Sequence, residues 1–259
     1  MNRALLAPPV TIAGVDGCKA GWVAVILELG AAPRARVCPD MATLVASLPD
    51  DATIAVDMPI GLPEFSARGG RGPEALVRRL LGERQSSVFS IPSRAAVYAH
   101  DAPFTTLDGW YAGHRQASAV ARATSDPPRA VSIQAFGILS KIREIDRLLA
   151  DRPELRARLL ESHPELAFWQ LNGRRPMNLP KKIKGRVNPA GMAERRALLT
   201  ACGFDAGFLE APPRGAAADD FLDAAAVMLV ALRHARGEAV SFPDPPAADE
   251  RGIPLAIWA

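Results

Sequence analysis

Four aspartates in this sequence are placed where they could hold a metal ion together. Asp16 and Asp57 each follow a short apolar run, at residues 10–15 and 53–56. Such runs predict buried strands, and open α/β sheets bind their ligands beyond the carboxyl ends of those strands. Either aspartate alone is equally typical of a turn cap, but a pair that flanks a predicted helix favours one shared functional site.

The other two aspartates open an apolar segment at residues 217–236, which predicts a buried helix that Gly237 ends. On a helix, residues i and i+3 share a face, so Asp220 and Asp223 point the same way. Asp219 lies about 100° round the helix and is expected only to cap it. Because nearly every face of the helix is apolar, Asp223 should be buried, and a metal ion would offset the cost of burying its charge.

The ligand types predict which ion this acidic site would bind. Two strand-end aspartates and an i, i+3 pair fit a two-metal centre, in which ions about 3.5–4 Å apart activate water and stabilise a leaving oxygen. Cys18, Cys38 and Cys202 are too far apart for a zinc site and are expected to be reduced thiols. Carboxylate oxygens alone favour Mg²⁺ or Mn²⁺.

A second group of candidates lies on a predicted strand at residues 159–165. Alternation along this strand puts Glu161, His163 and Glu165 on one face, although Pro164 argues against a central strand. The group could supply a further metal ligand or transfer protons, since histidine titrates near neutral pH. An edge strand with a polar outer face explains the same pattern, and both interpretations stay open.

Two loops carry groups that could hold phosphate. The loop at residues 82–94 offers hydroxyl and guanidinium groups, of which Ser86, Ser87 and Arg94 are the candidates. The proline- and glycine-punctuated loop at residues 176–191 is basic, and Lys182 is its candidate for a phosphate contact. The alternative for the basic loop is a solvated run of charge. Its cations are Lys181, Lys182, Lys184 and Arg186.

The surrounding elements follow the order β-β-β-α-β. Further strands are predicted at residues 22–29 and 35–38, and Asp40 and Pro49 bound a helix at 41–48. The middle of the chain is mostly helical, with apolar residues at helical spacing over 78–81 and 133–149. A last apolar run, at 253–258, is expected to form an edge strand.

Composition excludes several classes of protein. The 259 residues are 49% hydrophobic and 23% charged, which predicts a large core and argues against disorder. Lysine and arginine number 31 against 28 acids, and this net charge of +3 permits a polyanionic partner without requiring one. The longest apolar run, at 224–232, is half a membrane span, and residues 1–9 do not resemble a signal peptide. We therefore expect a cytoplasmic protein without a membrane partner.

The motifs together resemble a family of predicted nucleases, catalogued as domain of unknown function 429. The resemblance runs from about residue 12 to 258 and implies an RNase H-like α/β fold, a mixed sheet flanked by helices. We expect a single domain over 1–259, with a mostly helical insertion at about 64–158 after the fourth strand. The motifs are GVDG at 14–17, DMPIGLP at 57–63, SSVF at 86–89 with Pro92 and Arg94, HPE at 163–165 and DDFLDA at 219–224.

The arrangement is also similar to Holliday-junction resolvases of the RNase H-like superfamily, which place acids on the first strand, the fourth strand and the last helix. The fourth-strand acid is often glutamate there and is Asp57 here. By this resemblance, Asp16 would bridge two Mg²⁺ or Mn²⁺ ions and Asp57 and Asp223 would each hold one. Asp220 would be an additional ligand, and Glu165 or His163 would move a proton. The implied partner is DNA or RNA, and the sequence leaves a small phosphate ester open as the substrate.

Two other functions remain open from the sequence. An actin-like phosphotransferase or ATPase would use Asp16 and the following residues to 21 as a first phosphate loop, but a second glycine-rich phosphate loop is absent. A binding module that keeps the fold would bind metal or ligand without turnover. The oligomeric state is also open, a homodimer included.

Overall fold

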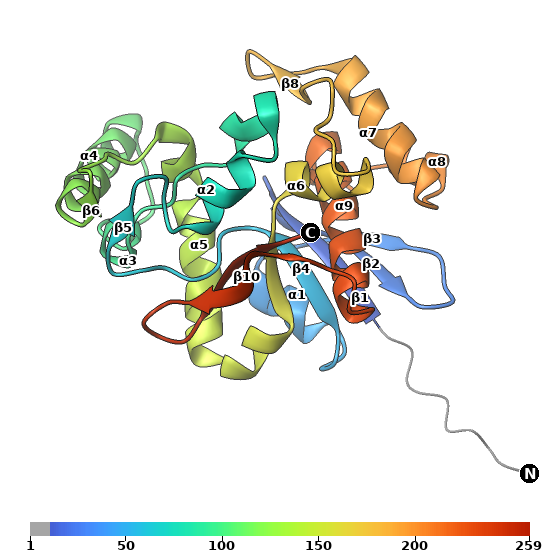
Figure 1. The fold of residues 1–259 in the computed structure, drawn as a ribbon, viewed down its shortest axis with the longest axis horizontal. Helices are drawn as coiled ribbons and strands as arrows, with labels where there is room; N and C mark the ends of the chain where they lie inside the picture. The colour runs from blue at the N-terminus through green and yellow to red at the C-terminus, as the bar shows by residue number, and fades with distance from the viewer. Residues whose placement is uncertain (1–10) are drawn as a thin grey trace, which may run out of the picture.

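The computed structural model describes residues 11–259, so the predicted strand start at Val10 and the segment 1–9 lie outside the described part. A seven-stranded sheet, in the order β10-β11-β7-β4-β1-β2-β3, forms the centre of the fold (Figure 1). Its strands are β1 (Thr11–Cys18), β2 (Gly21–Glu28), β3 (Arg34–Cys38), β4 (Thr53–Asp57), β7 (Leu159–Ser162), β10 (Ser241–Ala248) and β11 (Pro254–Trp258).

The sheet is mixed. Tight connections make β1, β2 and β3 an antiparallel meander, whereas β4 returns parallel to β1 after the helix α1 (Met41–Ala46). Strands β7 and β11 continue the parallel part, and β10 closes the far edge antiparallel to β11. This is the predicted α/β class, and it is consistent with an RNase H-like fold.

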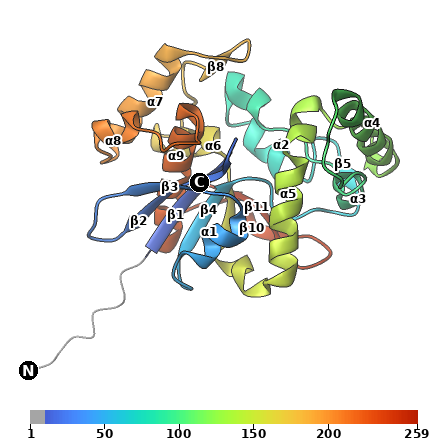
Figure 2. The same ribbon diagram turned by 180° about the vertical axis from the view of Figure 1, so that it is seen from behind.

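Alternating side chains of the central strands feed two apolar cores, one on each face. Ala13 and Val15 of β1 pack with α1 and with α5 (Ile133–Asp151). Ile12 packs on the opposite face with α9 (Ala218–Ala235). Helices α6 (Pro164–Leu171), α7 (Pro189–Ala201) and α8 (Ala206–Glu210) accompany α9, as Figures 1 and 2 show from opposite sides.

The connection between β4 and β7 is mostly helical, as expected. Its outer part, which includes α3 and α4, lies at the left of Figure 1, whereas α5 packs against the sheet. A basic hairpin of β8 (Lys182–Ile183) and β9 (Arg186–Val187) follows α6. The connection contains β5 (Ser66–Ala67), α2 (Pro73–Arg78), η1 (Gly82–Ser87), α3 (Arg94–Val97), α4 (Leu107–Ala123), β6 (Ser125–Asp126), α5 and η2 (Pro153–Ala157).

Three sequence predictions need correction. β1 continues through Asp16 to Cys18, so this aspartate lies within a strand rather than in the turn after it. The strand expected at residues 159–165 stops at Ser162, because Pro164 fits the first position of a helix and begins α6. The terminal apolar run forms β11, which is an inner strand, and the edge position belongs to β10.

No helix among residues 11–259 is long and apolar enough to cross a membrane.

Candidate metal centre

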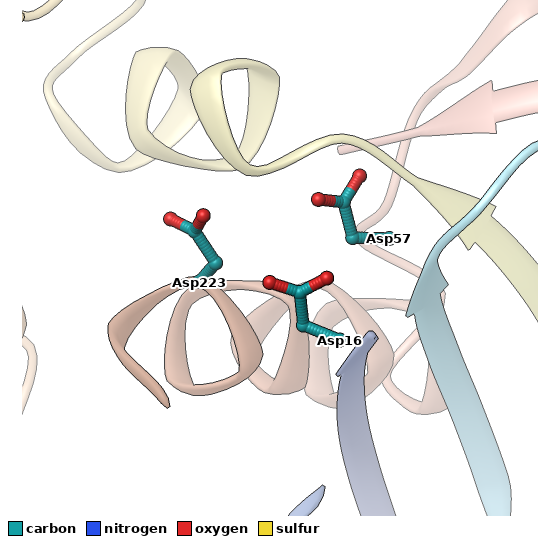
Figure 3. A group of neighbouring side chains, drawn as sticks. All are labelled: Asp16, Asp57 and Asp223. Carbon is teal, nitrogen blue, oxygen red and sulfur yellow. The ribbon is translucent and has the colours of Figure 1, made fainter. Parts of the chain in front are cut away.

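Three carboxylates meet at one end of the sheet. Asp16 of β1, Asp57 at the end of β4 and Asp223 of α9 each offer one oxygen, and these oxygens all lie within 4.8 Å of one another. Figure 3 shows the three side chains facing a common space. The parallel register of β1 and β4 pairs Val15 with Val56, which brings the next residue of each strand, an aspartate, into the group.

A glycine lets the third carboxylate reach the other two. A Cβ atom on Gly14 would lie 2.1 Å from the backbone oxygen of Ala224 and 2.1 Å from the backbone nitrogen of Met228. Strand β1 and helix α9 therefore touch through their backbones at this point. Asp223 precedes Ala224 directly, so this contact holds it opposite Asp16.

Burial makes this cluster electrostatically costly. Burial raises the pKa of Asp16 well above its ordinary value, and the charge of Asp57 raises it further. Burial also raises the pKa of Asp57, against the opposing charges of His163 and Lys181. The backbone N–H of Gly17 donates to Asp16 Oδ1 at 2.6 Å, which stabilises only one of these charges. The cluster is thus short of positive charge.

The donor set suits a hard divalent cation. Asp223 is 1% exposed, and its Oδ1 has no hydrogen-bond partner within residues 11–259. Its Oδ2 accepts from Lys181 Nζ, which supplies one positive charge to the three acids. A buried carboxylate oxygen without a partner is unfavourable unless a cation binds it, and an all-oxygen donor set fits Mg²⁺ or Mn²⁺.

The remaining two acids of the last helix have different places. Asp220 shares a helix face with Asp223 but stands outside the close group of oxygens. Its charge still contributes to the raised pKa of Asp16, so it lies close by, and its role as a ligand stays a prediction. Asp219 is not the cap that the sequence suggested. Ala217 holds the N-cap position, and Asp219 is buried and pairs with Lys182 Nζ at 2.5 Å.

Glu161, His163 and Glu165 do not share one strand face. Glu161 is buried and accepts from Arg71, and it lines the same cavity as Asp16 and Asp57. His163 lies at the N-cap of α6, where its Nε2 is 3.3 Å from the oxygen of Ser87 and its ring is close enough to lower the pKa of Asp57.

Glu165 follows in the first turn of α6 and is buried beside the metal centre. Arg195 Nη2 donates to Glu165 Oε1 at 2.5 Å, while Oε2 has no partner in the described chain. The charge of Glu165 helps to raise the pKa of Asp57. Glu165 and His163 therefore both flank the aspartates, although their roles stay predictions.

A cavity of about 230 Å³ opens beside the aspartates. Asp16, Asp57 and His163 line one part of it, and Phe89 and Ile138 supply apolar wall. It offers room for a small group of a substrate next to the carboxylates.

The chain matches the family described as protein of unknown function (DUF429) over residues 14–248. It belongs to this family. No curated protein and no solved structure matches it.

The phosphate candidates of this DUF429 member have different surroundings. Ser87 lines the cavity at the metal centre, Ser86 is exposed on a neighbouring cavity, and Lys182 faces Asp219 at the rim of the acidic cluster. Arg94 corrects the sequence-based expectation. Its side chain is buried between Asp146 at 2.5 Å and Asp249 at 2.7 Å, so its guanidinium is committed to the interior.

Two lysines near the aspartates were not singled out from the sequence. The sequence places Lys181 in a basic run that is also typical of a solvated surface, yet in the structure Lys181 reaches Asp223. Lys141 of α5 donates to the oxygen of Gly21 at 2.6 Å and lines the cavity at the metal centre. The basic run was a usable signal for Lys181, whereas Lys141 sits in an ordinary amphipathic helix.

Proposed function

We propose that this protein is a metal-dependent nuclease that hydrolyses phosphodiester bonds with Mg²⁺ or Mn²⁺. The observation that carries the proposal is the meeting of Asp16, Asp57 and Asp223 oxygens within 4.8 Å in a buried place short of positive charge. When bound, divalent ions in such a centre activate water and stabilise the leaving oxygen of a phosphodiester. Buried Cys18 and Cys38, both free thiols, agree with the cytoplasmic location that we propose.

Residues of the chain would bind the ions, transfer a proton and bind the substrate phosphates. Asp16, between the other two acids, would hold the ions together with Asp57 and Asp223. His163 stands beside Asp57 and would accept or return a proton at its ring, since imidazole changes charge near neutral pH. Lys181 would move its charge from Asp223 toward a substrate phosphate, and Ser87 and Lys182 at the rim would bind further phosphate oxygens.

A cleavage panel tests the proposal. Labelled junction, duplex, RNA–DNA hybrid and single-stranded substrates are incubated with wild type, Asp16→Asn and Asp108→Asn, each with Mn²⁺ or with EDTA. Asp108 is an exposed aspartate on α4 and serves as the matched control. We expect wild type and Asp108→Asn to cut at least one substrate with Mn²⁺ only. Asp16→Asn should lose about 100-fold or more, because even outer-shell changes at metal sites cost 10–100-fold.

The possible results separate three functions. Cleavage that survives Asp16→Asn contradicts the assignment. Mn²⁺ binding by calorimetry without cleavage of any substrate points to a binding module that keeps the site. Mn²⁺-dependent hydrolysis of ATP in place of nucleic acid points to a phosphotransferase or ATPase.

A further inference from the structure

A second cavity, of about 550 Å³, lies beside the one at the metal centre. Its walls come from α2, the segment 85–92, the β5–β6 pair and the start of α5, which lie together at the left of Figure 1. No carboxylate lines this cavity in the described part of the chain. Its polar lining includes Arg78, Arg129, Ser66, Ser86, Ser125 and Gln134.

Arg78 is held in place with donors to spare. Its Nε donates to the oxygen of Val88 at 2.9 Å, Nη1 to the oxygen of Gly69 at 2.7 Å, and Nη2 to Ser90 Oγ at 2.8 Å. A guanidinium has five N–H donors, so these three bonds leave two donors for a ligand. A fixed planar group of this kind is suited to phosphate recognition.

Arg129 places a second positive charge at the same cavity. It is exposed, and its guanidinium forms no ion pair with any residue between 11 and 259. Burial lowers the pKa of Arg78, and the charge of Arg129 lowers it further, so the two cations stand close together. Glu74 acts in the opposite direction, but its Oε1 is already bonded to Arg71 at 2.8 Å.

The second cavity shares walls with the cavity at the metal centre. Both cavities share Val88, Phe89 and Ile91 as a common wall. Helix α5 also passes both, since Gln134 lines the second cavity and Ile138 lines the first. These two residues are about one helical turn apart, about 6 Å along the axis. A substrate extending from the aspartates along α5 would reach the arginines.

We propose that this arginine-lined cavity binds a phosphate group of the substrate other than the one that is cleaved. The inference rests on the proposed function for the identity of the substrate. Arginine forms paired hydrogen bonds to phosphate oxygens, and a cavity lined by two cations and by no carboxylate of the described chain favours an anion. A phosphate bound here fixes the position and direction of the strand, so that another phosphate meets the aspartates. The source is the backbone of a nucleic acid.

Binding without metal tests this subsite apart from catalysis. A labelled single-stranded DNA of five nucleotides is titrated in EDTA against wild type, Arg129→Ala and Arg115→Ala, with anisotropy as the readout. Arg115 is an exposed arginine on α4 outside the cavity and is the matched control. We expect Arg129→Ala to weaken binding on the order of tenfold, as for loss of a charged hydrogen bond. It should also reduce the slope of log K against log salt by about 1.

A second variant and a second probe complete the test. Gln134→Glu puts an acid into the cavity at an exposed position and should weaken binding at least as much as Arg129→Ala. Equal binding by wild type, Arg129→Ala and Gln134→Glu would overturn the subsite. ATP replaces the oligonucleotide in a parallel titration, and Arg129-dependent binding of ATP alone would overturn the nucleic-acid source.

The subsite and the nuclease can fail separately. Arg129-dependent oligonucleotide binding without any cleavage in the panel supports the subsite and removes the nuclease. Cleavage that Arg129→Ala and Gln134→Glu leave unchanged in both rate and KM overturns the subsite and leaves the nuclease in place.

Discussion

Lys181 is the residue on which the charge balance of the metal centre depends most directly. Its ammonium pairs with Asp223 and acts against the raised pKa values of Asp16 and Asp57. Lys181 directly precedes the basic hairpin, and the next residue, Lys182 of β8, pairs with Asp219 in the same way. Two consecutive lysines thus supply two cations to two buried acids of α9. A divalent ion and Lys181 would then compete for the same carboxylate.

This competition predicts the effect of removing the lysine. We expect Lys181→Ala to bind Mn²⁺ about tenfold more tightly. The substitution removes a positive charge that repels the ion, and a loss of about 1.4 kcal/mol of repulsion corresponds to a tenfold gain in affinity. The variant should also melt at a lower temperature in EDTA, because the acids lose a counter-charge. Calorimetric titration and thermal melts measure the two effects. Arg186→Ala, at an exposed position of the hairpin, should change neither, and weaker Mn²⁺ binding by Lys181→Ala would disprove the competition.

At the scale of elements, the backbone contact between β1 and α9 fixes the site. The two elements have no space for a side chain at Gly14, and α9 contributes an apolar face that is buried along most of its length. Asp16 lies two residues beyond this contact and Asp223 one residue before it. Any change that separates the strand from the helix therefore also separates two of the three carboxylates.

Gly14→Ala should show this link. We expect a loss of about 3 kcal/mol or more in the free energy of unfolding, because the new methyl group meets backbone atoms rather than a mobile side chain. Mn²⁺ affinity should fall as well, since α9 must move. Gly137→Ala is the control in α5, where the added Cβ meets nothing within 4 Å and should stabilise by about 0.5–1 kcal/mol. Urea unfolding and Mn²⁺ titration of both variants would decide, and equal stabilities would contradict the contact.

The acidic cluster could be predicted because each of its members lies at a point that local sequence marks. Asp16 and Asp57 follow apolar runs on neighbouring parallel strands, and Asp223 lies in the second turn of a helix that is apolar on nearly every side. The local sequence gives no signal for the ion pairs that surround the cluster. Lys181 and Asp223 are 42 residues apart and Arg195 and Glu165 are 30 apart, so only the folded chain brings them together.

The fold shows the same division between local and distant signals. The meander, α5 and α9 follow periodic patterns and were predicted within a few residues. Strand β10 was missed because Pro243, Pro245 and Pro246 are unusual in a strand, and its place at the sheet edge is what allows them. Arg94 was misjudged because a guanidinium in a loop rich in hydroxyl groups resembles a phosphate ligand. Its two acidic partners lie 52 and 155 residues away.

For the whole molecule, two buried groups of charges join the helical connection to the sheet. Arg71 binds Glu74 and Glu161, which links α2 to β7. Arg94 binds Asp146 and Asp249, which links α3 to α5 and to the turn after β10. Removing the arginine from either group is expected to cost about 3–5 kcal/mol, because its two acidic partners would remain buried without a counter-charge. The three residues of the Arg71 group also line the cavity at the metal centre.

The first of these groups makes the stability of the whole chain depend on pH. Burial raises the pKa of Glu161 from 4.5 to about 7, although the charge of Arg71 opposes the change. The folded chain therefore binds more protons than the unfolded chain between these pH values, and its stability falls as the pH rises through this interval. At 1.36 kcal/mol for each pH unit, the fall is about 3 kcal/mol.

Glu161→Gln removes the group that titrates while keeping its shape, so it should be insensitive to this interval. We expect the variant and wild type to be similarly stable at pH 4.5, and the variant to gain up to about 3 kcal/mol relative to wild type by pH 7.5. Urea unfolding at several pH values measures the difference, and other titrating groups cancel in the comparison. Glu83→Gln, at an exposed glutamate on η1, should follow wild type throughout. Parallel profiles for wild type and Glu161→Gln would show that Glu161 stays ionised across the range, held by Arg71.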